Sequence, residues 1–220
     1  MDRLKQIFDR QREYMRSLAP IYGRNGFAIH NAWPYSINSR ADQEQLRLLA
    51  WRITEEIYEA LDLGESLNVE AFREEIADAL HFLVELAIVS DMDELSILAF
   101  SPGQRHSDLL SEAFSGVGYP RTEGAVAWMV MIEELARTMM LLKQRPWRTD
   151  NRPTDRAVWE SGMRCVFARF IAACRVSGIT AEDLYRAYFR KAEINDERTK
   201  AQSLVEEPEA GYFDDEGPHP

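Results

Sequence analysis

The sequence predicts an all-α protein, a helical bundle, and two observations support this prediction. The stretch from Ala50 to Ser90 holds two helical patterns that meet at a break over residues 63–68, where Gly64, Ser66 and Asn68 cluster. Because this connection is short, the two helices should be antiparallel neighbours. Other long helical patterns flank this stretch, and a chain with 45% hydrophobic residues can bury a substantial core.

Each further helix follows from the spacing of its apolar residues and from the residues that begin it. Ser39 or Asp42 should cap the first central helix, and Asn68 should cap the second. Thr180, with Asp183 three residues on, should form a capping box that begins the last helix. The expected helices span 2–18, 41–62, 68–90, 93–100, 106–114, 123–143, 154–176 and 180–200.

The chain is expected to form one domain over residues 1–202, followed by a flexible acidic tail over 203–220. The helical pattern weakens after Asp91, so 91–150 is a candidate for a mobile insertion, and the sequence leaves its movement open. Segment 19–40 is irregular, and its aromatic residues either stack on a base or anchor the loop to the core.

Composition limits the classes of partner. The chain has 26 basic and 37 acidic residues, a net charge of −11, so non-specific nucleic-acid binding is not expected. Cys165 and Cys174 are interpreted as thiols in a reducing compartment. No apolar run reaches the ~18 residues of a membrane span, and no secretion signal is recognisable. We therefore expect a cytoplasmic protein with no membrane partner.

Carboxylates are paired on the two central helices. Glu56 and Glu59 are three residues apart and share a face, with Glu55 beside them, and Glu75 and Asp78 repeat the spacing. Converging carboxylates repel each other unless a cation neutralises them. Mg²⁺ takes oxygen ligands and commonly works with a few carboxylates and substrate phosphates. The spacing therefore predicts a Mg²⁺ site for a phosphorylated substrate.

The alternative to a metal site is a stripe of polar residues on a solvent-exposed helix face, with spacing i, i+4, i+7 and i+11. Its members are Glu74, Asp78, His81 and Glu85. Leu48 and Trp51 precede Glu55 by seven and four residues, so the carboxylate face continues into apolar residues and should lie inside the bundle. Glu133 and Glu134 have no partner pair on another helix and are interpreted as surface residues.

The last helix and the first carry the candidate substrate contacts. Tyr188, Lys191, Asn195 and Arg198 fall at spacings of three, four and three and share one face. This face suits a triphosphate whose sugar or base lies near Asn195, and the alternative is a solvated terminal helix. Gln11 on the first helix either reads a base edge or bonds to a neighbouring helix.

Three separated segments resemble the all-α nucleoside triphosphate pyrophosphohydrolases, and within them the dimeric dUTPases. Residues 4–18 look like the family's opening helix, with Gln11 at the place of a base-contacting glutamine. Residues 55–61 (EEIYEAL) and 74–83 (EEIADALHFL) look like its metal motif, and residues 184–198 (LYRAYFRKAEINDER) look like its last motif. Tyr14 departs from the family, which often has Asn there.

The resemblance implies a homodimer that hydrolyses a deoxynucleoside triphosphate, first of all dUTP, to the monophosphate and pyrophosphate. The implied ligands of Mg²⁺, or of Mn²⁺ in its place, are Glu56, Glu59, Glu75 and Asp78. Glu56, or as the second candidate Glu55, would orient and deprotonate a water. The implied substrate-binding residues are Gln11, Tyr188, Lys191, Asn195 and Arg198. The Met- and Leu-rich helix over 123–143 is typical of a core or an oligomer interface.

Other functions stay open from the sequence. A related enzyme would act on another nucleotide, such as dCTP or a modified purine. Asp78 and His81 have the D-x-x-H spacing of a di-iron carboxylate bundle, although no second such motif accompanies them. A helical binding protein without catalysis would keep the fold, and the four carboxylates with the basic face argue against it.

Overall fold

The computed structural model confirms an all-α chain, and the residues that it describes contain no strand. These residues are 2–24, 33–64, 68–100, 106–116, 124–145, 147, 149 and 152–204, of which 19–24, 64 and 201–204 are described by their backbone alone. The elements in order are α1 (Arg3–Arg24), α2 (Arg40–Gly64), α3 (Val69–Val89), the 3-10 helix η2 (Ser96–Leu98), α4 (Leu109–Gly116), α5 (Gly124–Met140), α6 (Arg156–Val176) and α7 (Ala181–Leu204).

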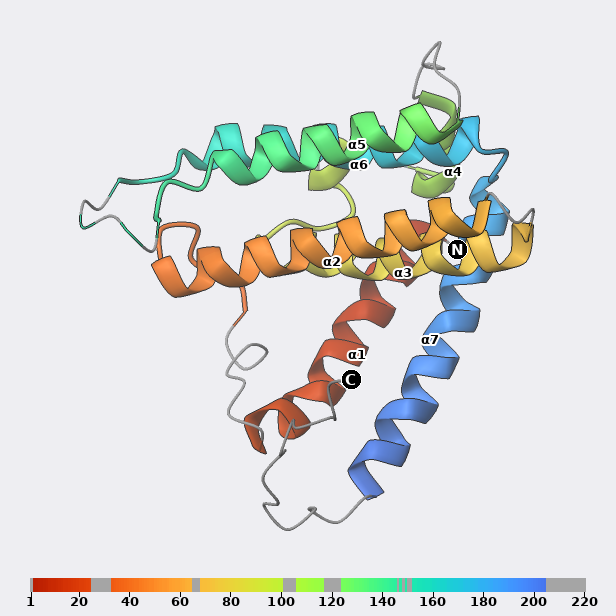
Figure 1. Cartoon of the computed structure of the whole chain (residues 1–220), viewed down its shortest axis with the longest axis horizontal. Helices are drawn as coiled ribbons and strands as arrows, with labels where there is room; N and C mark the ends of the chain where they lie inside the picture. The colour runs from red at the N-terminus through yellow and green to blue at the C-terminus, as the bar shows by residue number, and fades with distance from the viewer. Residues whose placement is uncertain are drawn as a thin grey trace, which may run out of the picture.

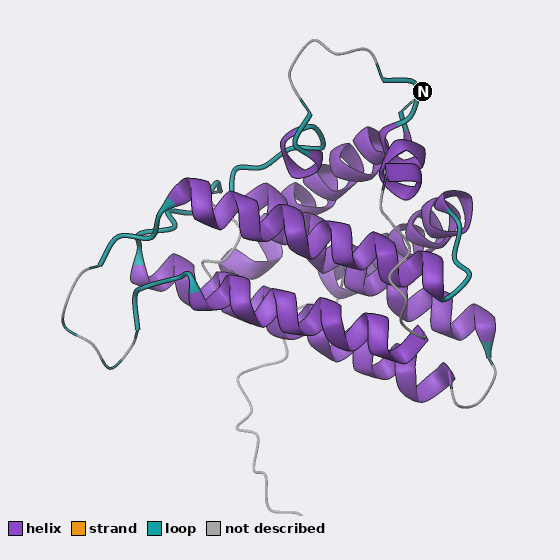
Figure 2. Ribbon diagram, turned by 90° about the horizontal axis from the view of Figure 1, so that it is seen from above, coloured by secondary structure: helices purple, strands orange, loops and turns teal. Residues whose placement is uncertain are grey.

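The long helices form three layers (Figure 1). Helices α2 and α3 lie side by side in the middle layer, antiparallel as predicted, with α5 and α6 packed together above them. Helices α1 and α7 form the third layer and descend from α3 (Figure 1). The view from above shows that the described regular structure is all helical (Figure 2). Helix α3 therefore has neighbours on several sides.

The predicted caps are present because each satisfies an amide that has no partner within its helix. Ser39 Oγ accepts a hydrogen bond from the Asp42 N–H at 3.3 Å. Asn68 caps α3 by accepting from the Ala71 N–H at 3.2 Å. The capping box at α7 is complete, since Thr180 Oγ1 accepts from the Asp183 N–H and Asp183 Oδ2 accepts from the Thr180 N–H, at 3.1 and 3.0 Å.

The position of α3 decides where the core lies. Nearly every residue from Ile76 to Val89 is buried, including the charged or polar side chains of His81 and Glu85. The solvated-stripe interpretation of these two residues is therefore wrong. A helix that is apolar around its whole circumference belongs inside a protein, and in residues 82–89 (FLVELAIV) every residue except Glu85 is apolar. This run was the signal that could have predicted their burial.

Other expectations need correction. Helix α1 runs to Arg24 instead of ending at residue 18, and of the helix expected over 93–100 only the turn η2 forms. Leu48 and Trp51 are 44% and 60% exposed, so the argument that they carry the carboxylate face into the core is wrong. The buried face of α2 is a different one; it consists of Leu46, Leu49, Ala50, Ile53, Ile57 and Ala60.

Two expectations fall partly outside the described residues. Residues 203 and 204 belong to α7, and the rest of the expected tail lies outside the described part of the chain. Within 91–150 the structure places η2, α4 and α5, and α5 packs against both α6 and α2. Whether this segment moves stays an open question of the sequence analysis. In the described residues, no helix has the length and apolar character needed to cross a membrane.

Candidate active site

Three carboxylates meet where α2 faces α3. Glu56 comes from α2, and Glu75 and Asp78 come from one face of α3. Their carboxyl oxygens lie within 4.8 Å of one another, and they form the one group of this kind that the described residues contain. Hard oxygen ligands at this separation suit a divalent cation, so the donor set fits the predicted metal.

The other predicted acids lie around this cluster. Glu59, one turn along α2 from Glu56, is exposed and outside the three-residue group, although its charge still acts on Glu56. Glu55 is half-buried and pairs with Arg52 at 3.2 Å. The structure therefore brings together three of the four predicted ligands and places Glu59 at their edge.

Burial and mutual repulsion shift the pKa values of two carboxylates in this cluster. Burial, followed by the nearby charges of Asp78, Glu59 and Glu75, raises the pKa of Glu56 to about 7. Burial also raises the pKa of Asp78, although Lys191 opposes this with an ion pair of 2.6 Å. Burial acts to lower the pKa of Lys191, yet the bond to Asp78 outweighs it and the pKa is raised. The site thus holds the carboxyl groups of Glu56, Glu75 and Asp78 and one paired cation, the Lys191 ammonium group.

A cavity of about 460 Å³ adjoins the cluster and is lined by side chains from α1, α2, α3 and α7. The predicted residues that line it are Gln11, Glu56, Asp78, Lys191, Asn195 and Arg198. Carboxylates and cations therefore face the same space, as binding of a phosphorylated ligand with a metal requires. The lining residues that the sequence analysis did not assign to substrate are Tyr14, Leu18, Gln45, Leu48, Leu49, Arg52, His81, Phe82 and Glu85.

Tyr188 differs from its predicted neighbours on α7. Its side chain is fully buried and does not line the cavity. The ring stacks on His81 with centroids 4.0 Å apart, and the hydroxyl lies 2.9 Å from the Gln11 amide oxygen. Tyr188 therefore supports Gln11 from behind instead of lining the space itself, which does not agree with its assignment as a direct substrate contact.

The buried position of His81 also bears on the di-iron alternative. Both ring nitrogens already have partners, since Nδ1 lies 2.9 Å from Gln11 and Nε2 lies 3.3 Å from the Tyr188 carbonyl. A D-x-x-H metal motif needs a free imidazole nitrogen aimed at the ion. The geometry of His81 therefore argues against that alternative.

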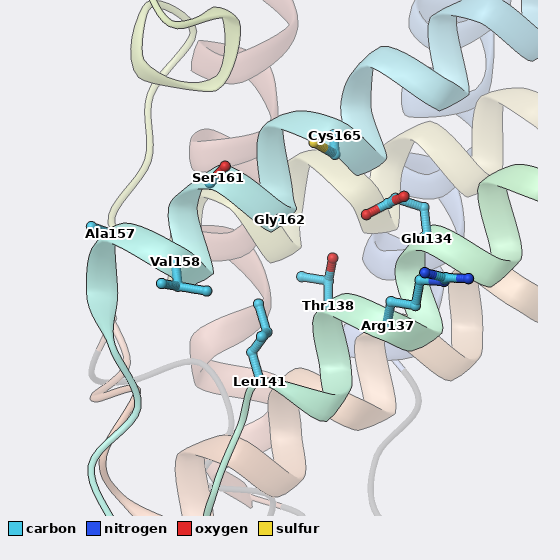
Figure 3. A pocket seen from close by; sticks show the side chains of 9 residues that line it. All are labelled: Glu134, Arg137, Thr138, Leu141, Ala157, Val158, Ser161, Gly162 and Cys165. Atoms are coloured by element: carbon cyan, nitrogen blue, oxygen red, sulfur yellow. The ribbon is translucent and has the colours of Figure 1, made fainter.

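A second hollow, of about 440 Å³, lies between α5 and α6 (Figure 3). Thr138 of α5 points toward Gly162 of α6 there, and a Cβ atom at Gly162 would stand 2.8 Å from Thr138 Oγ1. The glycine thus permits close approach of the two helices. None of the predicted site residues lines this hollow, so the chemistry is expected at the first cavity, which is lined by α1, α2, α3 and α7.

The pKa of Glu56 gives a pH-dependent prediction. Because its pKa in the folded state is raised from 4.5 to about 7, the folded protein binds more protons than the unfolded chain between these values. This group therefore lowers the free energy of unfolding as pH rises through that window. In Glu56→Gln, denaturant unfolding with EDTA present should show a stability relative to wild type that increases over the same window. A difference independent of pH would contradict the prediction.

An all-α bundle that holds clustered carboxylates and cations around one cavity has the features of a metal-dependent enzyme for phosphorylated substrates. A family model described as dUTPase matches residues 63–202, well over half of the chain, and the chain belongs to this family. It is therefore a nucleoside triphosphate pyrophosphohydrolase, of the dUTP diphosphatase type, from a family that generally depends on a divalent metal. No curated protein and no solved structure matches the chain.

The matched range holds only part of the candidate site. It includes Glu75, Asp78 and the three cavity-lining residues of α7. It leaves out Gln11 and Glu56. The contribution of α1 and α2 to the site therefore rests on the geometry of the cavity and the carboxylate cluster.

Proposed function

We propose that this enzyme hydrolyses dUTP to dUMP and pyrophosphate with Mg²⁺ as its metal. The observation that supports this most directly is the cavity in which Glu56, Asp78 and Lys191 meet, with the Asp78–Lys191 pair at 2.6 Å. Negative and positive groups in contact at one point suit a substrate whose phosphates carry a bound cation.

Each group has a role in this proposal. Glu75, Asp78 and Glu56 would hold Mg²⁺, with Glu59 available at the edge, and the bound ion would polarise the phosphates and acidify a water. Glu56 orients that water and accepts its proton, a role that suits a carboxylate whose pKa is about 7.

The cations of α7 serve the phosphates. Lys191 and Arg198 line the cavity and neutralise charge that builds up as the phosphate bond breaks. Lys191 is held at Asp78, whereas Arg198 is exposed at the rim of the cavity. Asn195 lies between them on the helix and, with Gln11, reads the base or sugar.

The direct test is pyrophosphate release from canonical and modified deoxynucleoside triphosphates with Mg²⁺, repeated with Mn²⁺ and with EDTA. We expect dUTP to give the highest kcat/KM and EDTA to abolish turnover. A clear preference for dCTP or a modified purine nucleotide would replace the proposed substrate while leaving the reaction type. Full activity in EDTA would contradict the metal-dependent mechanism.

The two outer residues of the α7 face should have separable roles. Arg198→Ala removes a charge-assisted contact worth roughly 1.5–3 kcal/mol and should lower kcat/KM for every nucleotide alike. Asn195→Ala removes an amide that is proposed to hydrogen-bond the base or the sugar. It should therefore change the ratio of kcat/KM between dUTP and dCTP, or between deoxyribose and ribose forms. Measurement of both variants over that set decides the matter. Wild-type behaviour of both would reduce this face to a solvated helix.

We also propose a homodimer, which the family resemblance implies. Helix α5 buries Trp128, Met131 and Leu135 in the core, so this part of its Met- and Leu-rich pattern is core packing. Its other side still exposes Val126, Met129 and Met140, which leaves apolar surface available to a partner. Light scattering at micromolar concentration should give twice the chain mass of 25.4 kDa. A monomer under these conditions would contradict the proposal.

A further inference from the structure

Buried polar side chains link α1, α3 and α7 at the wall of the cavity. Gln11, His81, Glu85 and Tyr188 are exposed by only 1%, 6%, 6% and 0%. The Gln11 amide oxygen lies 2.9 Å from both His81 Nδ1 and the Tyr188 hydroxyl, and its nitrogen lies 3.3 Å from Glu85 Oε2. Gln11, His81 and Glu85 line the cavity, so the state of this network decides what the wall offers a ligand.

With the Gln11 amide oxygen toward His81 and Tyr188, two polar contacts have no hydrogen to share. His81 Nε2 faces the Tyr188 carbonyl oxygen at 3.3 Å, and the Tyr188 hydroxyl also faces the Ile7 carbonyl oxygen at 3.2 Å. Every partner of the imidazole and the phenol is then an oxygen acceptor. A neutral imidazole has one N–H and a phenol one O–H. One contact of His81 and one of Tyr188 therefore lack a donor, which is costly for buried groups.

The opposite orientation of the amide occupies the same volume and exchanges its oxygen and nitrogen. The Gln11 NH₂ group then donates to His81 Nδ1 and to the Tyr188 hydroxyl oxygen. His81 Nε2–H donates to the Tyr188 carbonyl, and the Tyr188 O–H donates to the Ile7 carbonyl. Each of these contacts now has one hydrogen. The remaining contact joins the Gln11 oxygen to a Glu85 oxygen, and only a protonated Glu85 supplies its hydrogen.

A protonated His81 is the competing solution. An imidazolium would donate from both ring nitrogens in the first orientation, yet one contact of the Tyr188 hydroxyl would still lack a hydrogen. Burial lowers the pKa of His81 to about 3, and the positive charges of Arg10 and Lys191 act in the same direction. The proton is therefore disfavoured on His81.

Glu85 is the better holder of the proton. Burial raises the pKa of Glu85 to about 7. The charge of Glu85 acts on three phenols, Tyr14 of α1, Tyr35 of the segment before α2 and Tyr188 of α7, and burial raises the pKa of each, so none of these three supplies a charge. The number of available hydrogens and the effect of burial on the two pKa values therefore both favour a proton on Glu85.

We propose that Glu85 is a positioning residue that carries a proton and donates a hydrogen bond to the Gln11 amide oxygen, which commits both Gln11 N–H groups to His81 and Tyr188. Gln11 then offers a ligand an oxygen lone pair and no N–H. The ligand group that fits is an N–H donor, such as the ring imide of a uracil base. This inference rests on the proposed function in one respect, that a nucleobase occupies this cavity.

The location of the imidazole hydrogen tests the network without any substrate. The chain contains four histidines, and replacement of His30, His106 and His219 by Gln leaves only the ¹⁵N signals of His81. We expect a neutral ring with its hydrogen on Nε2 at a pH below the pKa of Glu85. A hydrogen on Nδ1, or on both nitrogens, would overturn the proposed orientation.

Two substitutions test the role of Glu85 in binding. Glu85→Gln keeps a neutral donor for the Gln11 oxygen, whereas Glu85→Leu removes the donor from a similar volume. We expect Glu85→Leu to raise KM for dUTP about tenfold with a smaller change in kcat, and Glu85→Gln to recover most of that loss while His81 keeps its hydrogen on Nε2. An equal rise in KM for both variants, or a shift of the hydrogen to Nδ1 in Glu85→Gln, would overturn the positioning role.

The two measurements separate this inference from the proposed function. Absence of turnover for every nucleotide, combined with an Nε2–H imidazole, would reject the substrate and keep the network. Turnover of dUTP with a hydrogen on His81 Nδ1 would keep the substrate and reject the network.

Discussion

Glu56→Gln and Asp78→Asn are each expected to lower kcat/KM for dUTP by about 100-fold or more. Loss of a group that only supports a metal ligand typically costs 10–100-fold, and these two carboxylates are expected to be ligands themselves. Each change keeps the volume of the side chain and removes its charge. The helical circular dichroism should therefore stay that of the wild type, because Glu56 and Asp78 are half-buried at a cavity and not in the apolar core.

The measurement is turnover of dUTP over a range of Mg²⁺ concentrations. Weakened metal binding raises the Mg²⁺ concentration at half-maximal rate, whereas loss of the proton acceptor lowers the rate at saturating Mg²⁺. Glu133→Gln is a matched control, since Glu133 is an exposed carboxylate on α5 that pairs with Arg137 at 2.6 Å. Near-normal turnover by either site variant would remove the proposed metal site.

Lys191→Met is expected to act in opposite directions on the metal and on the nucleotide. Its side chain is only 13% exposed, and its ammonium group pairs with Asp78. Removal of this cation leaves the carboxylates of Glu56, Glu75 and Asp78 without their embedded positive charge, so Mg²⁺ should bind the free enzyme more tightly. The phosphates lose a charge-assisted contact, so kcat/KM should fall about 10- to 100-fold.

Calorimetric titration of the free enzyme with Mg²⁺ and steady-state kinetics with dUTP measure the two effects separately. Lys5→Met provides the control, because Lys5 is an exposed lysine on α1 that pairs with Asp9 away from the cavity. Weaker Mg²⁺ binding combined with normal kcat/KM would show that Lys191 only stabilises the fold at Asp78.

The all-α fold and much of the candidate site could be predicted from the sequence because they depend on local pattern. Asn68 and the pair Thr180–Asp183 cap their helices as predicted, since a cap satisfies amides within a few residues of itself. The spacing of Glu75 and Asp78, combined with the short connection to α2, was enough to place both near Glu56.

Helical spacing predicts which residues share a face of a helix, but it does not predict which face another helix will cover. Lys191, Asn195 and Arg198 line the cavity as their spacing suggested, whereas Tyr188 from the same series is buried behind Gln11 of α1. That difference depends on the crossing of α1 and α7, whose residues are far apart in the chain (Figure 1).

The largest difference between what helical spacing suggests and what the structure shows concerns burial. His81 and Glu85 have the spacing of a solvated stripe, and Trp51 of α2 has the character of a core residue, yet the first two are buried and Trp51 is 60% exposed. The sequence by itself determined the helices, their caps and the carboxylate pairs, because these depend on interactions between residues close in the chain. Only the tertiary structure decided which side chains leave water, because packing of α1, α2 and α7 around α3 is what removes His81 and Glu85 from solvent and shifts their pKa values.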